Sequence, residues 1–284
     1  MATRRDGRSE AQTGGVDGFA FAWDQAVLDA TLFQQREKAS AVADAARHLR
    51  EAIILCLLPS GARLPTEPEL AQRLGVGVVT MHAALTLLRE EGFIITRRGR
   101  HGGSWVASTD EIVRASMRSA SFELAELREQ SEVLIALESQ AMGLAAVRAT
   151  DEERAAILET ARFPRDGMSV EERQRHSNVF HLQIALAARN VELLDAIRRR
   201  RARLQELRTV AVGHLVFCTH GGHYQPLIAQ AIADGDPDEA RNVCHRFLTD
   251  CWTCNITVID YRGGVEGRDV ALIGPLDARL HLAD

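Results

Sequence analysis

Residues 41–106 hold three short segments in which apolar residues recur at helical spacing, followed by two short segments typical of β-strands. The first segment, 41–58, ends at a Pro-Ser-Gly triplet that breaks a helix. Thr66 and Glu69 then have the spacing of a capping box, because each side chain can bond the other's backbone amide. This spacing predicts a second, shorter helix that runs to about Leu74.

The third helical segment, 78–91, begins after a Gly-Val-Gly turn and ends at Gly92. Residues 93–96 and 104–106 are strand candidates, and the tip between them, 97–103, holds three arginines and three glycines. This element order is that of a winged helix-turn-helix domain. In such a domain the third helix enters a DNA major groove and the hairpin reaches neighbouring phosphates. The sequence therefore predicts a partner, double-stranded DNA.

The same region resembles the DNA-binding domain of the GntR superfamily of transcription regulators. The matching residues are Ser60 to Glu67, Glu69-Leu70-Ala71, Leu74-Gly75-Val76, Ala84-Leu85, Leu88, Glu91-Gly92-Phe93 and Gly102 to Val106. The resemblance implies a DNA operator and a homodimer, since such operators mirror a two-fold axis. It places the DNA contacts at Thr66, Val78, Val79, Thr80, His82, Arg97, Arg98, Arg100, His101, Gly102 and Gly103.

The third helix departs from the family at the positions that read bases. Two arginines that the resemblance leads us to expect are Val78 and His82 here, and a third, beside the capping box, is Pro68. Valine cannot donate a bidentate hydrogen bond to guanine, although it can pack on a thymine methyl group. We therefore expect DNA binding to depend more on Arg97, Arg98 and Arg100 than on this helix.

From Leu127 onward the sequence reads as a series of amphipathic helices, which predicts an all-α bundle. The expected helices are 127–148, 150–161, 169–188, 191–213, 223–234 and 237–260. The fold class is mainly α, with a small β-hairpin in the winged domain. We divide the chain into an N-terminal extension (1–38), the winged helix-turn-helix domain (39–108), a linker (109–126), the helical domain (127–262) and a C-terminal tail (263–284).

The helical domain resembles the FCD-type effector domain of the FadR subfamily. The matches are Glu138, Leu144-Ala145-Ala146, Phe180-His181, Asn190, Ile228, Ala231-Ile232, Gly235-Asp236 and Ala240-Arg241. The resemblance implies a small-molecule effector inside the bundle. In the frame that these matches set, the effector-site positions are Leu134, Ser177, His181, Gln225 and Phe247. Leucine and phenylalanine there favour a partly apolar ligand.

The family often binds a divalent metal through one aspartate and three histidines, and only His181 matches that set in the same frame. We therefore expect no cofactor. The alternative is a zinc site in which His223 and His245, whose separation is that of the family, join His181. A metal-dependent enzyme would need such a site, and the sequence supplies no complete ligand set or general base at motif spacing. We predict that the protein is not an enzyme.

Composition narrows the remaining classes. The 284 residues include 46% hydrophobic ones and carry a net charge of −5, while residues 36–106 carry +3. The only lysine, Lys38, does not lie in a phosphate-binding loop, and no apolar run is long enough to span a membrane. The odd number of cysteines, five, favours a cytoplasmic protein. We interpret the CxxC at 251–254 as helix packing rather than a redox pair, and the four arginines at 198–201 as a solvated helix face. A regulator-derived protein without sequence-specific DNA binding stays an alternative.

Overall fold

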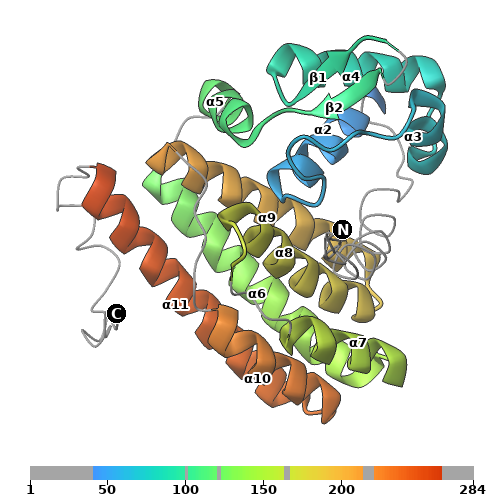
Figure 1. Cartoon of the computed structure of the whole chain (residues 1–284). Helices are drawn as coiled ribbons and strands as arrows, with labels where there is room; N and C mark the ends of the chain where they lie inside the picture. Colours follow the sequence, from blue (N-terminus) through green and yellow to red (C-terminus); the bar gives the residue numbers. More distant parts are fainter. Residues whose placement is uncertain (1–40, 100–101, 120–122, 163–166, 214–220, 264–284) are drawn as a thin grey trace, which may run out of the picture.

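The computed structural model describes residues 41–99, 102–119, 123–162, 167–213 and 221–263. Figure 1 shows two parts, a small domain with a β-hairpin and, below it, a longer bundle of helices. The predicted fold class, a winged helix-turn-helix joined to an all-α bundle, is confirmed.

The winged domain consists of α2 (Ala41–Ile54), α3 (Glu67–Leu74), α4 (Val78–Glu91), β1 (Ile94–Arg97) and β2 (Gly103–Val106). Each of α3 and α4 ends at a glycine in the left-handed region, Gly75 and Gly92, as the sequence predicts. The strands pair antiparallel, with Ile94 opposite Val106. Fully buried apolar side chains fill the core between α2, α4 and β1, and they include Leu49, Met81, Leu85, Leu88 and Phe93.

Glycine is required at the base of the hairpin tip. A Cβ at Gly102 would lie 2.7 Å from the carbonyl oxygen of Arg97 and 2.8 Å from that of Gly99, which is closer than real side chains approach. Gly99 itself has a φ of +106°, a conformation that side chains disfavour. The hairpin therefore turns as tightly as it does because these positions carry no side chain.

The bundle consists of α6 (Leu124–Arg148), α7 (Asp151–Arg162), α8 (Val170–Ala187), α9 (Val191–Val212), α10 (Gly221–Ala233) and α11 (Pro237–Gly263). Helix α6 packs against α8, α9, α10 and α11 and is the central helix of the bundle. One cluster of buried apolar side chains continues from the winged domain into α8 and α9. A second cluster fills the far end, between α6, α7, α10 and α11.

The segment that we expected to link the two domains contains a helix, α5 (Thr109–Ser119). It packs against α9 of the bundle, while α9 also contacts α2 of the winged domain. The two domains therefore share a packed seam. Within the described residues no single helix is both long and apolar enough to cross a membrane; only α3 and α4 taken together, across a bend of 107°, meet the two criteria.

Candidate nucleic-acid interface and internal cavity

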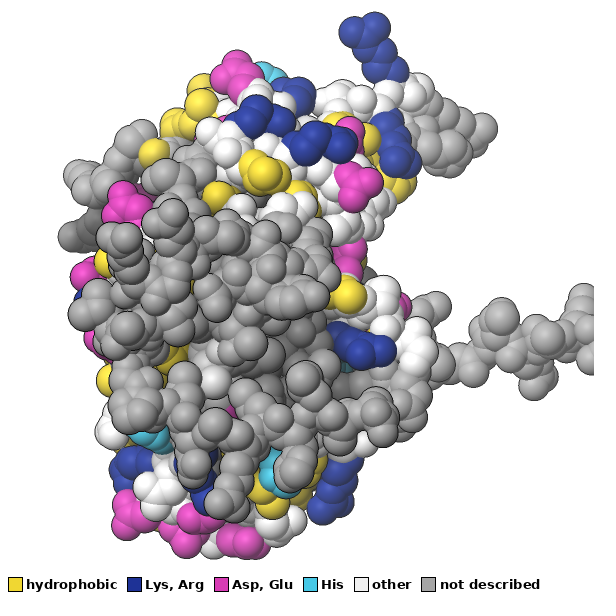
Figure 2. Space-filling view, turned by 90° about the vertical axis from the view of Figure 1, so that its left-hand side faces the viewer, with side chains coloured by type: hydrophobic (Ala, Val, Ile, Leu, Met, Phe, Trp, Pro, Cys, Tyr) yellow, Lys and Arg dark blue, Asp and Glu magenta, His cyan; other side chains and the backbone are white. Residues whose placement is uncertain are grey.

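A groove of about 670 Å³ lies between α3, α4 and the hairpin. Five of the residues expected to contact DNA line it, namely Thr66, His82, Arg98, Gly102 and Gly103. On the face shown in Figure 2, arginine side chains lie at the upper end of the molecule, where the winged domain lies, and others lie at the lower end beside acidic side chains. Arg100 and His101, two further expected contacts, lie outside the described residues.

Helix α4 presents three more of the expected contacts, and the last one, Arg97, ends β1. Val79 is 86% exposed and Val78 is 49% exposed, while Thr80 is half-buried. His82 is exposed, and its Nδ1 lies 3.1 Å from a carboxylate oxygen of Glu67 on α3. The first two turns of the helix thus present apolar side chains and a histidine beside a carboxylate.

Three arginines, Arg63, Arg89 and Arg97, are held in place by neighbours in the hairpin, and the first two of them line the groove. The guanidinium of Arg97 lies over the ring of Trp105, 4.2 Å from its centre, so a cation–π contact orients it. Arg63 donates from Nη2 to the carbonyl oxygen of Gly102 at 2.9 Å, and Arg89 donates from Nε to Oγ1 of Thr96 at 2.8 Å.

Sequence reasoning did not select Arg63 and Arg89 as DNA contacts, although both line the groove. Arg63 lies inside the run of residues that carries the family resemblance, so the sequence held a signal that could have identified it as a DNA contact. Arg89 lies in the last turn of α4 and offers no such signal.

Inside the bundle, a cavity of about 60 Å³ lies between α6, α8, α9 and α11. Three of the five expected effector-site residues line it: Leu134, Ser177 and Phe247. The other lining residues are Gln174, Arg201, Leu204, Arg208, Leu248 and Cys251.

The remaining two expected residues lie behind this lining. His181 is buried and stacks on the ring of Phe247, with the ring centres 5.4 Å apart. Gln225 is buried as well, and its Nε2 donates to Oγ of Ser177 at 3.3 Å. The five residues are therefore brought together, but only three form the wall.

A buried ionic group lies beside the cavity. Oε1 of Glu138 accepts from Nη1 of Arg201 at 2.5 Å, and Oε2 lies 2.7 Å from Nδ1 of His181. Burial raises the pKa of Glu138, but Arg201 and His181 outweigh it and lower that pKa to about 2. Burial and the charge of Arg201 both lower the pKa of His181. At neutral pH we therefore expect an ionised Glu138 beside a neutral His181.

The interpretation of the arginines at 198–201 as a solvated helix face is wrong for two of the four. Arg198 is only 1% exposed and pairs with Glu51 of the winged domain, and Arg201 is nearly buried against Glu138. Arg199 is exposed and pairs with Asp195 on its own helix. The two inward arginines are three residues apart, which places them on one side of α9.

The side chains around His181 do not fit a divalent metal. The other expected effector-site residues supply a hydroxyl and an amide, from Ser177 and Gln225, which bond each other, and Phe247 stacks on the ring of His181. His223 and His245 are both exposed, so they do not converge with His181. Within the described part of the chain, no three His, Cys, Asp or Glu side chains form a group that could hold a metal.

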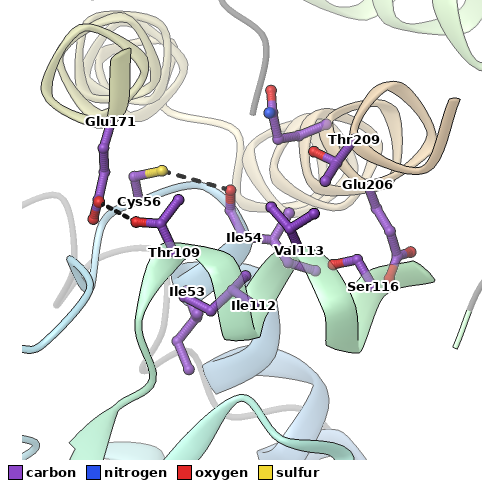
Figure 3. A pocket seen from close by; sticks show the side chains of 11 residues that line it. Ile53, Ile54, Cys56, Thr109, Ile112, Val113, Ser116, Glu171, Glu206 and Thr209 are labelled. Carbon is purple, nitrogen blue, oxygen red and sulfur yellow. Dashed lines mark hydrogen bonds between the residues drawn. The ribbon is translucent and has the colours of Figure 1, made fainter. Parts of the chain in front are cut away.

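Polar contacts cross the seam between the two domains. Glu171 of α8 accepts from Oγ1 of Thr109 at 2.8 Å (Figure 3). It also accepts from the backbone amide and the hydroxyl of Ser60, at 2.6 and 2.9 Å. Arg50 donates to Glu206 of α9 at 2.6 Å. The gap left at the seam is only about 20 Å³, so the domains are closely packed here.

One more seam contact leads inward to the cavity. Asn178 donates from Nδ2 to the carbonyl oxygen of Leu55, directly after α2, at 2.8 Å. Its Oδ1 accepts from Nε of Arg201 at 3.0 Å. A single side chain of α8 therefore connects the winged domain with an arginine of the cavity wall.

Residues 41–102 match the family described as bacterial regulatory proteins, gntR family, and residues 129–250 match the FCD domain. A Mycobacterium gastri protein named as HTH-type transcriptional regulator RmpR is 30% identical over 213 residues, which are 73% of this chain and 76% of the relative. An Escherichia coli protein named for regulation of the L-lactate dehydrogenase operon is 32% identical over 155 residues, or 50% of this chain and 56% of the relative.

Among solved structures, E. coli McbR/YncC has a TM-score of 0.46 and 17% identity, covering 79% of this chain and 99% of that one. The family and the extent of the first relative decide the assignment. This chain belongs to the GntR family of bacterial regulatory proteins, and it is a DNA-binding transcription regulator whose C-terminal FCD domain binds an effector.

Proposed function

We propose that this regulator binds its operator as a homodimer, and that a small molecule in the FCD cavity changes its affinity for DNA without a metal. The observation that carries the proposal is the composition of the cavity wall. Leu134 and Phe247 supply apolar surface, and Arg208 supplies a guanidinium group beside Arg201, which is paired with Glu138. A ligand with an apolar body and one anionic group matches such a wall.

The proposal requires the cavity to enlarge when an effector binds. Ligand sites usually measure about 300–1,000 Å³, whereas this cavity measures about 60 Å³. An effector must therefore push the walls apart, and it binds the open arrangement better than the closed one. A ligand changes DNA affinity only through such a preference.

Three further parts of the proposal concern the kind of activity, the compartment and the oligomeric state. The protein acts by binding and not by catalysis, it works in the cytoplasm, and its dimer matches a two-fold operator. Light scattering of the full chain measures the dimer directly. A monomer at micromolar concentration would contradict that part and leave the DNA and effector parts standing.

The DNA part is tested by selection from a random duplex pool with the full chain. We expect one sequence to be enriched, with an affinity for DNA that depends more on Arg97, Arg98 and Arg100 than on α4. Arg98→Ala should lower the salt slope of binding by about one unit if it neutralises one phosphate. Arg199→Ala, an exposed arginine of the bundle, is the matched control and should leave the slope unchanged. A pool that enriches no sequence would favour a protein that has lost sequence-specific DNA binding.

The metal part is tested by zinc titration at fixed pH. The wild-type protein should bind zinc weakly, whereas Ser177→Asp, Gln225→His and Phe247→His together should create a site beside His181, because they supply an anionic ligand and two imidazoles. Tight binding by the wild type, lost in His223→Ala or His245→Ala, would instead assign zinc to the alternative histidine set and reopen the enzyme hypothesis.

A further inference from the structure

The outward side of α4 carries a line of methyl groups. Its opposite side is the buried stripe of Met81, Ala84, Leu85 and Leu88. Val79, Ala83 and Thr86 stand at positions i, i+4 and i+7, so their side chains share one face of the helix. We call these three residues the apolar ridge. Val79 is the most exposed of them, and Ala83 and Thr86 are half-buried.

The ridge has no charged competitor in the first three turns of α4. The only arginine of α4 is Arg89, in its last turn, where it bonds Thr96. His82 flanks the ridge and lies against Glu67. Arg89 also reaches the hydroxyl of Thr86 at 3.5 Å, at the C-terminal end of the ridge. The first three turns of α4 therefore present no arginine or lysine, the side chains that most often bond guanine, to base edges.

The chemistry of the major groove supplies a match for this surface. Thymine is the only one of the four bases that presents a methyl group there. The groove beside the ridge is lined by Arg63 and Arg98, which suit phosphates and leave the base edges to α4. Helix α4 contributes His82 and Arg89 to the same groove, so its apolar ridge lies on an element of the expected DNA interface and fits a thymine-containing stretch of duplex.

We propose that the apolar ridge is the specificity-determining surface of this regulator, and that it reads thymine methyl groups in the operator. The inference rests on the proposed binding of duplex DNA through α4 and the hairpin. It assigns the central contact to Val79, whose side chain is the most exposed of the three.

The test compares thymine with uracil, which lacks only that methyl group. The probe is the duplex enriched from the random pool, with each thymine replaced by uracil in turn, and affinity is measured by fluorescence anisotropy. One replacement or more should weaken wild-type binding about 4-fold, the effect of one methyl group removed from water. In Val79→Ala the loss of affinity caused by uracil should become close to zero at one of these positions. Val147→Ala, an exposed valine on α6, is the matched control and should keep the wild-type pattern.

The outcomes separate this inference from the function on which it rests. An enriched duplex that binds equally well with thymine or uracil at every position would overturn the ridge and leave DNA binding intact. A uracil effect that is unchanged in Val79→Ala would move the contact away from the ridge and overturn the assignment. A pool that enriches no sequence would overturn sequence-specific binding and the ridge together.

A different observation, the buried contacts of Asn178, carries a second inference. Helix α8 shows one face to the seam and another to the cavity. Glu171 and Asn178, seven residues apart, bond the winged domain, while Ser177 lines the cavity. Asn178 is 1% exposed, and both ends of its amide are occupied, one by the Leu55 carbonyl and one by Arg201.

We infer that Asn178 couples the cavity to the winged domain, so that movement of Arg201 changes the hold on the end of α2. The inference rests on the proposed effector site. A ligand that enlarges the cavity displaces its wall, and Arg201 is the wall residue bonded to Asn178. When the hydrogen bond from Arg201 is lost, the side-chain amide of Asn178 can rotate away from the carbonyl oxygen of Leu55.

Amide hydrogen exchange at Leu55 and Leu57 tests this without ligand or DNA. Arg201→Lys keeps a positive charge beside Glu138 and removes the donor to Asn178, so exchange there should speed up about 5-fold, the effect of one hydrogen bond. In the Asn178→Asp background, which already lacks the donor to Leu55, Arg201→Lys should have no further effect. Gln183→Ala is the control, because Gln183 is buried on the same helix and contacts Thr160 instead.

Additive effects of Arg201→Lys and Asn178→Asp would overturn the coupling, since two residues in one chain of contacts cannot act independently. Unchanged exchange in Asn178→Asp alone would overturn it as well. Neither result bears on whether the protein binds an operator or an effector.

Discussion

The two domains of this regulator differ in what they bury. The winged domain packs apolar side chains, and among its described residues, 41–99 and 102–107, the only buried charged or polar residue is Glu51, at the seam. The bundle buries ionisable and amide groups throughout. These include Glu138, Gln174, Asn178, His181, Gln183, Arg198, Gln205, Glu206 and Gln225.

The difference matches two tasks. Apolar packing has one well-filled arrangement, which suits a domain that must present α4 and the hairpin in fixed positions. A buried polar network is strong when every partner is in place and costly when one is lost, so it responds sharply to a ligand that moves one member. The winged domain is therefore the constant part and the bundle the responsive part.

The largest effect should come from breaking the buried ion pair of the bundle. Arg201→Met leaves Glu138 with an uncompensated charge, and we expect it to lower the free energy of unfolding by about 3–5 kcal/mol. Adding Glu138→Leu should restore a large part of that loss, because it removes the stranded charge. Urea unfolding of the full chain, followed by circular dichroism, measures both. Arg199→Met, on the exposed side of the same helix, should change stability by less than about 1 kcal/mol. A double variant no more stable than Arg201→Met would contradict this account.

In the winged domain the corresponding change is the loss of a fully buried leucine. Leu85→Ala should cost about 2–5 kcal/mol through lost burial and the cavity left behind. Leu87→Ala, on the same helix with a side chain that is 38% exposed, is the control and should cost less than about 1 kcal/mol. If the domains differ as described, Leu85→Ala should also abolish operator binding at temperatures where the bundle stays folded. Equal costs at positions 85 and 87 would break the comparison.

Acid should distinguish the bundle from the winged domain. The pKa of Glu138 is lowered to about 2, so its ionised form stabilises the fold above its unfolded pKa, about 4.3, and that contribution is lost as pH falls toward 2. The difference in Tm between wild type and Glu138→Gln should therefore be largest above pH 4.5 and shrink steadily below it. A difference that does not vary between pH 6 and 2.5 would show that Glu138 is not the titrating group.

The sequence predicted well where local signals decide the structure. Gly75, Gly92 and the Thr66–Glu69 pair locate α3 and α4, and the long amphipathic periods locate the helices of the bundle. Three of the positions that the family matches identified, Leu134, Ser177 and Phe247, line one cavity.

It predicted poorly where the partner lies far away in the chain. Arg201 reads as one of four adjacent arginines, and only Glu138, 63 residues earlier, explains why it turns inward. Asn178 meets the carbonyl of Leu55 across 123 residues, and neither residue carries a signal of that contact. The polar interior of the bundle is a property of packed helices, and single-helix periodicity does not contain it.

The smallest effect concerns two helix caps of the same kind, Thr66–Glu69 in the winged domain and Ser169–Glu172 in the bundle. Glu69 accepts from the amide and the hydroxyl of Thr66, both at 2.8 Å, and Glu172 accepts in the same way from Ser169 at 2.7 and 2.8 Å. The hydroxyl of Ser169 also accepts a hydrogen bond from the amide of Glu172, at 3.2 Å. The corresponding contact between the hydroxyl of Thr66 and the amide of Glu69 does not meet hydrogen-bond geometry.

Ser169→Ala should therefore cost about 1 kcal/mol of unfolding free energy, and Thr66→Ala about 0.5 kcal/mol, the low end of the range for caps. Thr66 lines the DNA groove, so its replacement should also weaken operator binding, whereas Ser169→Ala should leave DNA affinity unchanged. Urea midpoints and anisotropy titrations of the two variants give both numbers. A larger stability loss for Thr66→Ala than for Ser169→Ala would show that the winged domain relies on its polar cap as much as on its apolar core, and the contrast between the domains would then be weaker than their buried residues indicate.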